Sequence, residues 1–284
     1  MPEIFRIGQM TQDGEQIVVE VEDKYWKAFK GIDGFSHIHC LAVTAYAEMT
    51  VISGRADTSD MRKGILRLIT RMPLRVNQKD FPLDLIDIKP YIPSEDYVPV
   101  QEGTGMNVKI HGRGCDQDSS YEIPCVGEIR NTHGVTYLQY KDHAEMPQSF
   151  TEYEHVVWWF DKFDEKKYRR ILQCKTPYCG ELKVGVFASR APVRPNPVAL
   201  TVAKIERIDH ENNRVYISGI ESYDHTPFLG MLDYDPKIDA FSKEEVNLPF
   251  WAQEWPDEVD VEDKAELTRK VNEIAMRLDA GLRD

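Results

Sequence analysis

The sequence has few cysteines, no long apolar run and no excess of basic residues, and each shortage argues against a class of protein. Its five cysteines are odd in number and irregularly spaced, which does not suit a disulfide framework and favours a reducing compartment. No apolar stretch reaches the roughly 18 residues of a membrane-spanning helix, so no contact with a membrane is expected. The start, MPEIFRIGQM, lacks the features of a secretory signal, and we expect a cytoplasmic protein.

Basic charge is also scarce, because the formal net charge is −13 at pH 7. Proteins that bind nucleic acid usually carry a basic stripe that neutralises phosphates. The overall charge therefore does not favour nucleic acid, although a local basic pocket is compatible with an acidic surface.

Several motifs of well-known chemistry are missing. The chain has no phosphate-binding loop, nucleophile elbow or dinucleotide fingerprint. Cys174 and Cys179 in CKTPYC resemble half of a metal site, but no second Cys/His pair has a matching spacing. We therefore expect two ordinary thiols and no metal.

The sequence does contain an internal similarity. FRIGQM at residues 5–10 is similar to PCVGEI at 124–129, and the strand pattern that follows Gly14 returns after Gly134. TRMPLRVNQ, which starts at Thr70, is similar to SRAPVRPNP, which starts at Ser189. These pairs predict two copies of one unit.

The predicted units are unequal. We assign residues 1–100 to a degenerate copy, 101–120 to a linker, 121–256 to a fuller copy and 257–284 to an acidic amphipathic helix. Short β-branched and aromatic runs between turn residues favour a mostly β barrel or sandwich. Residues 198–234 are predicted to form a hairpin and a turn that the first copy has lost.

A stiff cationic loop, GVFASRAPVRPNPVAL, covers residues 185–200. Its three prolines hold Arg190 and Arg194 close together, which suits a carboxylate, a phosphate or a purine edge. The alternative is that the loop only crosses a barrel mouth and pairs with neighbouring acids.

A second candidate, SYDHTP at residues 222–227, collects Asp224 and His225 at a turn, where it forms either a site or a simple Asx turn. His37 and His155 fall in the middle of predicted strands and are expected to be core histidines.

With these motifs and LDLIDIKPYIP at residues 83–93, the chain resembles the TsaA-like family, which includes tRNA methyltransferase O enzymes. The resemblance implies small TsaA-like β-barrels, S-adenosylmethionine as cofactor, action as a dimer and methylation of threonylcarbamoyl-adenosine in tRNA.

Carried over by position, the resemblance also implies the site. Asp224 and His225 would be catalytic, with Asp224 as the base, and His225 stands where the family has glycine. The residues implied to bind the cofactor are Arg190, Arg194, Asn196, Leu200, Asp224, His225, Thr226 and Pro227.

The two copies divide the family motifs between them. The first keeps Asp87, Lys89 and Tyr91, and the second keeps the arginine loop. We hypothesise a fused pseudo-dimer in which Asp87, Lys89 and Tyr91 form a wall of one site centred on the second copy. A homodimer of the fused chain stays open.

The substrate also stays open, between tRNA and a small-molecule acceptor, because the end of the chain is acidic. A module that binds S-adenosylmethionine without catalysis is the remaining alternative.

Overall fold

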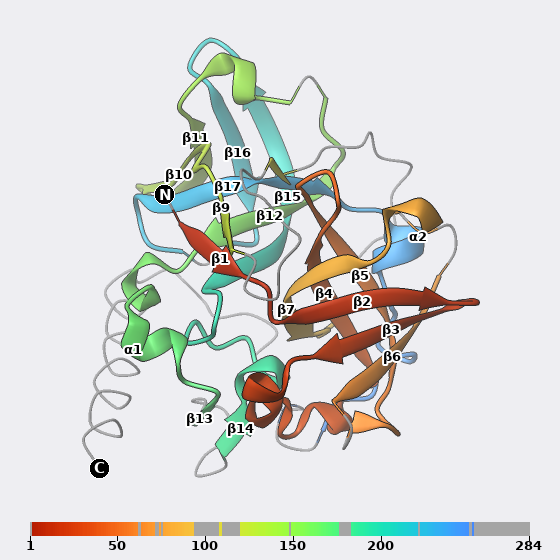
Figure 1. Ribbon diagram of the computed structural model, residues 1–284. Helices are drawn as coiled ribbons and strands as arrows, with labels where there is room; N and C mark the ends of the chain where they lie inside the picture. Colours follow the sequence, from red (N-terminus) through yellow and green to blue (C-terminus); the bar gives the residue numbers. More distant parts are fainter. Residues whose placement is uncertain are drawn as a thin grey trace.

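The protein is built from two closed β-barrels, which confirms the predicted mostly β fold (Figure 1). The computed structural model describes residues 2–61, 64–71, 74, 76–93, 108–109, 120–147, 149–175, 183–220, 222–249 and 252. Among these residues, no helix has the length and hydrophobicity needed to cross a membrane.

The first barrel, barrel 1, closes in the order β4-β7-β2-β3-β6-β5 through a β4–β5 pairing, and β8 extends it beside β5. Its strands are β2 (Gly8–Asp13), β3 (Gln16–Val21), β4 (His37–Val43), β5 (Glu48–Asp57), β6 (Ile65–Thr70), β7 (Leu83–Pro90) and β8 (Val108–Lys109).

The second barrel, barrel 2, closes in the order β10-β11-β16-β15-β12-β17. When β2 is matched to β10, this cyclic order is the same as in barrel 1. Its strands are β10 (Gly127–Thr132), β11 (Val135–Tyr140), β12 (Tyr153–Trp159), β15 (Val198–Asp209), β16 (Arg214–Ser218) and β17 (Thr226–Asp233).

The other elements lie outside the barrel walls. Two short sheets pair β1 (Glu3–Phe5) with β9 (Ser120–Glu122) and β13 (Gln173–Lys175) with β14 (Lys183–Gly185). The helices are η1 (Asp23–Phe29), η2 (Ile32–Gly34), η4 (Gln78–Asp80), η5 (His143–Glu145), η6 (Asp161–Phe163), α1 (Lys166–Arg169), η7 (Val186–Ala188) and α2 (Pro236–Asp239).

Matching glycines and bulges show that the barrels share local geometry as well as strand order. Gly8 and Gly127 each start the first strand, and a Cβ there would lie 2.1 Å and 2.2 Å from a carbonyl oxygen of the next strand. Only glycine permits that approach. The third strands of the two barrels in chain order, β4 and β12, also each shift register once, β4 against β7 and β12 against β17.

The strand order corrects part of the sequence alignment. Residues 70–78 join β6 to β7, whereas residues 189–197 precede β15, so the two arginine loops are not equivalent. The β15–β16 hairpin matches β5–β6, and barrel 1 has therefore not lost a hairpin. The similarity of the loops is compositional, because hydrogen-bonded ladders, and not loop residues, define equivalent positions.

Part of the predicted linker belongs to the fold, since Val108 and Lys109 pair with β5. The predicted closing helix at 257–284 lies outside the described residues.

The barrels share a continuous apolar core in which β4, β5 and β7 face β12, β15 and β17. The connection between β12 and β15 also leaves its own barrel, and Phe187 packs edge-on against Phe29 of η1, 5.5 Å away. This connection contributes to the core of barrel 1. The residues of the shared core are Ile4, Leu41, Val43, Met49, Val51, Ile86, Tyr121, Ile123, Val157, Trp159, Val198, Leu200, Leu229 and Leu232.

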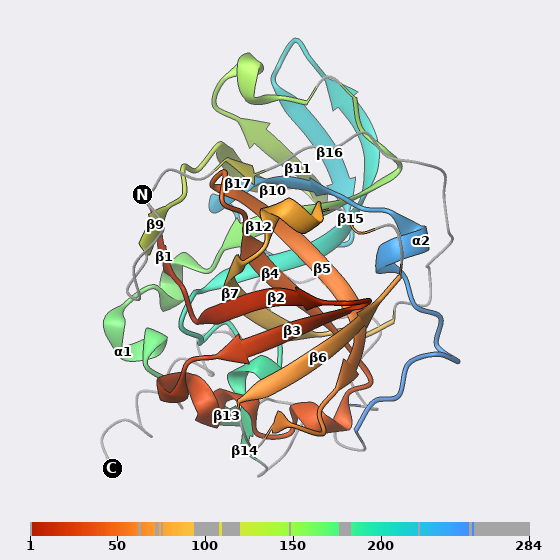
Figure 2. The same cartoon turned by 45° about the vertical axis from the view of Figure 1, so that its right-hand side comes forward.

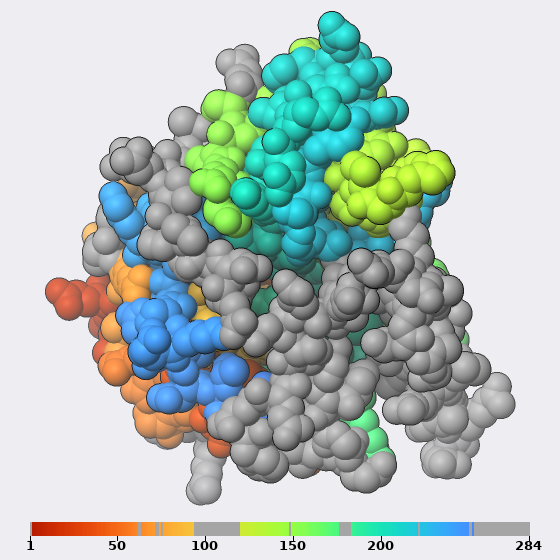
Figure 3. Space-filling view, turned by 180° about the vertical axis from the view of Figure 1, so that it is seen from behind, coloured from red at the N-terminus to blue at the C-terminus, as the bar shows by residue number. Residues whose placement is uncertain are grey.

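The segment after β17 also crosses to barrel 1, as its blue path beside β5 and β6 shows in Figure 2 and from behind in Figure 3. Arg71 of barrel 1 donates to the Ala240 carbonyl at 2.5 Å and pairs with Glu245 at 2.5 Å. Both sequence halves are therefore tied together twice, by the β12–β15 connection and by this segment.

We predict that Gly185→Ala destabilises the protein by about 3 kcal/mol, as overpacking does when backbone atoms must move. The Gly185 N–H donates to the Lys30 carbonyl at 2.7 Å, and a Cβ would lie 2.0 Å from the Ala28 carbonyl oxygen. Urea unfolding measures the effect. Gly134→Ala is the control, because φ is +78° there but the space is open, and about 1 kcal/mol is expected. Equal losses would contradict the close packing at Gly185.

Candidate active site between the two barrels

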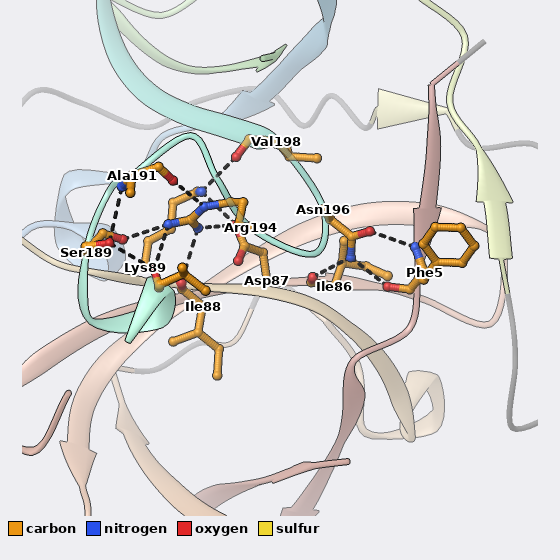
Figure 4. Close-up of polar contacts among 11 residues, drawn as sticks. Phe5, Ile86, Asp87, Ile88, Lys89, Ser189, Ala191, Arg194, Asn196 and Val198 are labelled. Carbon is orange, nitrogen blue, oxygen red and sulfur yellow. Dashed lines mark hydrogen bonds and ion pairs between the residues drawn. The ribbon is translucent and has the colours of Figure 1, made fainter. Parts of the chain in front are cut away.

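Arg194 lies at the junction of the barrels with its guanidinium fully buried (Figure 4). One nitrogen donates to Asp87 Oδ2 of β7 at 2.6 Å. The others donate to the carbonyl oxygens of Ala191, Ser189 and Val186 at 2.9, 2.7 and 2.9 Å. Arg194 therefore shapes its own loop and anchors it to barrel 1.

Asn196 has a similar anchoring geometry. Its Nδ2 donates to the carbonyls of Phe5 and Ile86 at 2.7 and 2.8 Å, and its Oδ1 accepts from the Phe5 N–H at 2.8 Å (Figure 4). The side chain thus acts as an extra peptide group between β1 and β7.

Lys89 meets the loop from the side of barrel 1. Its Nζ donates to Asp87 Oδ2 and to the Val198 carbonyl, both at 2.7 Å. Burial lowers the pKa of Lys89 to about 7, and the charge of Arg194 adds to this effect while Asp87 opposes it. One carboxylate thus faces two buried cations.

Arg190 differs from these anchored groups. It is exposed, and its guanidinium makes no hydrogen bond or ion pair with the described part of the chain. Desolvation, followed by the charge of Arg194, nevertheless lowers its pKa to about 10, and Tyr91 opposes this shift. The charge of Arg190 in turn lowers the pKa values of Lys89 and His39, which places its guanidinium near these barrel 1 residues at the junction.

Aromatic and imidazole rings from barrel 1 surround this position. Tyr91 hydrogen-bonds through its hydroxyl to the backbone of Phe241 at 3.0 and 3.1 Å. The His39 ring lies 5.1 Å from Tyr91 and 6.0 Å from His155. Desolvation, then His155 and Arg190, hold the pKa of His39 well below its ordinary value, so its ring is neutral.

Two histidines, His37 and His155, were expected from the sequence to lie in the core. His37 and His155 are buried, as predicted, but they lie at the junction of the barrels. The ladder registers make His39 the equivalent of His155, because both precede the register shift of their strand by two residues. His39 was missed as a site residue, and its only signal is the alternation in SHIHC.

Leu200 and the Asp224–Pro227 turn occupy other places. Leu200 is buried in the shared core. The turn precedes β17, where Thr226 is buried opposite Ile129 of β10. Asp224 Oδ1 accepts from Arg130 Nε at 3.0 Å and from the Asn131 N–H at 2.8 Å.

His225 sits in the left-handed region, with φ +64°, which accounts for the glycine that the family has here. Its Nδ1 lies 2.8 Å from Glu128 Oε2, and its Nε2 lies 3.6 Å from Asp224 Oδ2. Desolvation alone would raise the pKa of Asp224, but the hydrogen bonds from Asn131 and Arg130 outweigh it and the pKa is lowered.

The predicted site residues thus form two groups. Arg190, Arg194, Asp87, Lys89 and Tyr91 come together at the junction. In the described residues, the polar contacts of Asp224 and His225 go to β10 and to each other. No group of three or more His, Cys, Asp or Glu side chains that could hold a metal ion occurs among the residues that the structure describes.

The fold is thus a pair of β-barrels with the same strand order and with buried cations at their junction. Residues 118–240 match the family model described as the tRNA-methyltransferase O N-terminal domain. A probable S-adenosyl-L-methionine-binding protein of Pyrococcus horikoshii is 35% identical over 124 residues, which is 43% of this chain and 88% of that relative. The chain belongs to this family.

Other relatives are covered to very different extents. A probable S-adenosyl-L-methionine-binding protein of Methanocaldococcus jannaschii is 29% identical over 42% of this chain and 97% of its own length. The tRNA (adenine(37)-N6)-methyltransferase of Mus musculus is 36% identical over 31% of this chain, but only 20% of that enzyme is matched.

A solved structure of TrmO from Pseudomonas aeruginosa has 20% sequence identity and a TM-score of 0.32, over 43% of this chain and 59% of that one. A similarity at this level carries no weight for the fold, which rests on the strand pairings themselves.

The buried Lys89 should make stability depend on pH. Its pKa is about 7 in the folded protein and about 10.4 in an unfolded chain. Between these values the unfolded state binds more protons, so the free energy of unfolding rises with pH, by at most about 1.4 kcal/mol per pH unit. Urea unfolding from about pH 7.5 to 9 should show this rise in the wild type but not in Lys89→Met.

Lys204→Met is the matched control, because Lys204 is partly exposed beside Glu152 and should leave the slope unchanged. Parallel profiles for the wild type and Lys89→Met would mean that Lys89 keeps its proton in both states.

Proposed function

We propose that the chain is an S-adenosylmethionine-dependent methyltransferase that acts on an adenine of tRNA. The observation that carries the proposal is Arg190, an accessible guanidinium without a partner among the described residues, at the junction of two barrels with the same strand order. The names of the archaeal and mammalian relatives support the cofactor and the substrate class.

The junction suits S-adenosylmethionine in its charge. Arg190 would bind the carboxylate of the methionine part, because a guanidinium pairs with a carboxylate through two parallel hydrogen bonds. Tyr91 and neutral His39 offer ring faces beside it without adding a second charge. When bound, S-adenosylmethionine supplies an activated methyl group on a sulfonium.

We assign positioning roles to residues whose polar atoms are already used. Arg194 and Asn196 hold the loop that carries Arg190, and Leu200 packs beneath it in the shared core. Asp87 and Lys89 secure the same loop from barrel 1. A positioned cation loses little entropy on binding, which favours affinity.

His225 is the better acceptor for the proton that an adenine amine loses on methylation. The hydrogen bond to Glu128 Oε2 places a proton on Nδ1 and leaves Nε2 free to accept one. Asp224, with its lowered pKa, is the weaker base and would help to orient the ring. His225 and Asp224 are thus our proposed catalytic pair.

The same strand order in both barrels supports a fused pseudo-dimer with one site, because each barrel carries a different part of the family motifs. Within this proposal, residues 1–100 and 121–256 remain the two units. A further homodimer is not required.

The acceptor within the tRNA is proposed to be the adenine amine that the enzyme relatives are named for. Its threonylcarbamoyl form, a small-molecule acceptor and binding without catalysis remain predictions from the sequence. Formation of S-adenosylhomocysteine with total tRNA, with free adenosine or with neither separates a tRNA acceptor, a small-molecule acceptor and binding without catalysis.

We expect Arg190→Ala to weaken S-adenosylmethionine binding by about 10- to 100-fold, the loss of a charged hydrogen-bonded pair. Calorimetric titration measures it, and Arg190→Lys should recover only part of the affinity because it cannot bind bidentately. Lys204→Ala, a partly exposed lysine on β15, is the control. Wild-type binding that Arg190→Ala leaves unchanged would exclude the junction as the cofactor site.

A further inference from the structure

A row of arginine and tyrosine side chains crosses the outer face of barrel 2. The ladders place Arg207 of β15 opposite Tyr216 of β16, Tyr216 opposite Tyr137 of β11, and Tyr137 opposite Arg130 of β10. Arg214, two residues before Tyr216 on β16, faces the same side. We call these five residues the Arg–Tyr row.

The side chains of the Arg–Tyr row stack on one another. Arg207 Cζ lies 3.8 Å from the centre of the Tyr216 ring, and Arg214 Cζ lies 4.8 Å from that of Tyr137. The two tyrosine rings are 5.4 Å apart. Hydrogen bonds from Arg214 and then Arg207 lower the pKa of Tyr216, which also fixes its ring.

The fold itself does not require these residues. On barrel 1, the equivalent ladder positions hold Thr11, Val18, Arg67 and Asp57. Barrel 1 therefore closes with the same strand order without aromatic rings at these positions. Of the two barrels, barrel 2 alone carries the Arg–Tyr row.

The row also ends beside the proposed site. Arg130, at one end, forms an ion pair with Asp224 at 3.0 Å, and Asp224 adjoins His225. The strands β11 and β16 extend away from barrel 1, at the top of Figures 1 and 2. A molecule lying along the row would thus reach the turn from the outside of barrel 2.

We propose that the Arg–Tyr row is the docking surface for unpaired bases of an RNA loop, which it presents to the Asp224–His225 turn. This inference rests on the proposed function and specifies where its substrate binds. Bases of single-stranded RNA stack on aromatic rings and on guanidinium planes. The row offers the partly exposed Tyr216 ring and the exposed Arg207 guanidinium, whereas Tyr137 is buried beneath Arg214 and supports them.

The charge of the Arg–Tyr row differs from that of a groove that binds the phosphate backbone of RNA. Asp224 and Asp209 lie beside Arg130 and Arg207, and Glu206 lies beside Ser218 on the neighbouring strand. The row therefore has little net positive charge to attract phosphates. Binding should depend on open bases and only weakly on salt, and a fully paired RNA should bind poorly.

The test uses the full chain and a fluorescent RNA stem-loop, with a fully paired RNA duplex as the second probe. Tyr216→Ala should weaken stem-loop binding by about tenfold or more, the effect of losing one stacked base. Tyr216→Phe should keep the affinity because it keeps the ring face. Arg67→Ala, at the matched position of barrel 1, should have no effect.

Titration of every variant with S-adenosylmethionine separates this inference from the proposed function. Intact cofactor binding together with unchanged RNA binding in Tyr216→Ala would overturn the docking surface alone. Equal binding of stem-loop and duplex would also overturn it. If Arg207→Ala and Tyr216→Ala change only self-association in sedimentation, the row is a protein interface. If the wild type does not bind S-adenosylmethionine at all, the proposed function is overturned instead.

Discussion

The buried ion pair between Arg194 and Asp87 is the contact on which the rest of the junction depends. It joins a loop of barrel 2 to a strand of barrel 1 at 2.6 Å, and Lys89 shares the same carboxylate oxygen. A buried charge pair contributes little net stability, but it strongly disfavours arrangements that leave one charge alone. The pair therefore mainly selects one conformation of the loop, the one in which Asp87 faces both Arg194 and Lys89.

The conformation of this loop also determines where Arg190 lies. The same loop carries the saturated Arg194 and the accessible Arg190, four residues apart, so anchoring one guanidinium presents the other. The division resembles that of many binding sites, in which buried polar residues hold the geometry and one exposed group meets the ligand. The three prolines around them limit the alternative conformations of the loop.

Exchange of segments makes the two barrels dependent on each other. The β12–β15 connection completes the core of barrel 1, and the segment after β17 packs on barrel 1 through Arg71 and Phe241. Neither barrel alone contains the whole junction.

The β-barrel class, the resemblance to the family and the chemical character of the loop could all be predicted from the sequence, because alternation, glycine turns and paired arginines are local patterns. It misaligned the loops at 70–78 and 189–197, since composition does not reveal which strands are neighbours. The fold, by bringing the loop against β1 and β7, makes Arg194 and Asn196 anchors and leaves Arg190 accessible. It also brought together the Arg–Tyr row from four strands, because cross-strand neighbours are set by ladder register and not by distance along the chain.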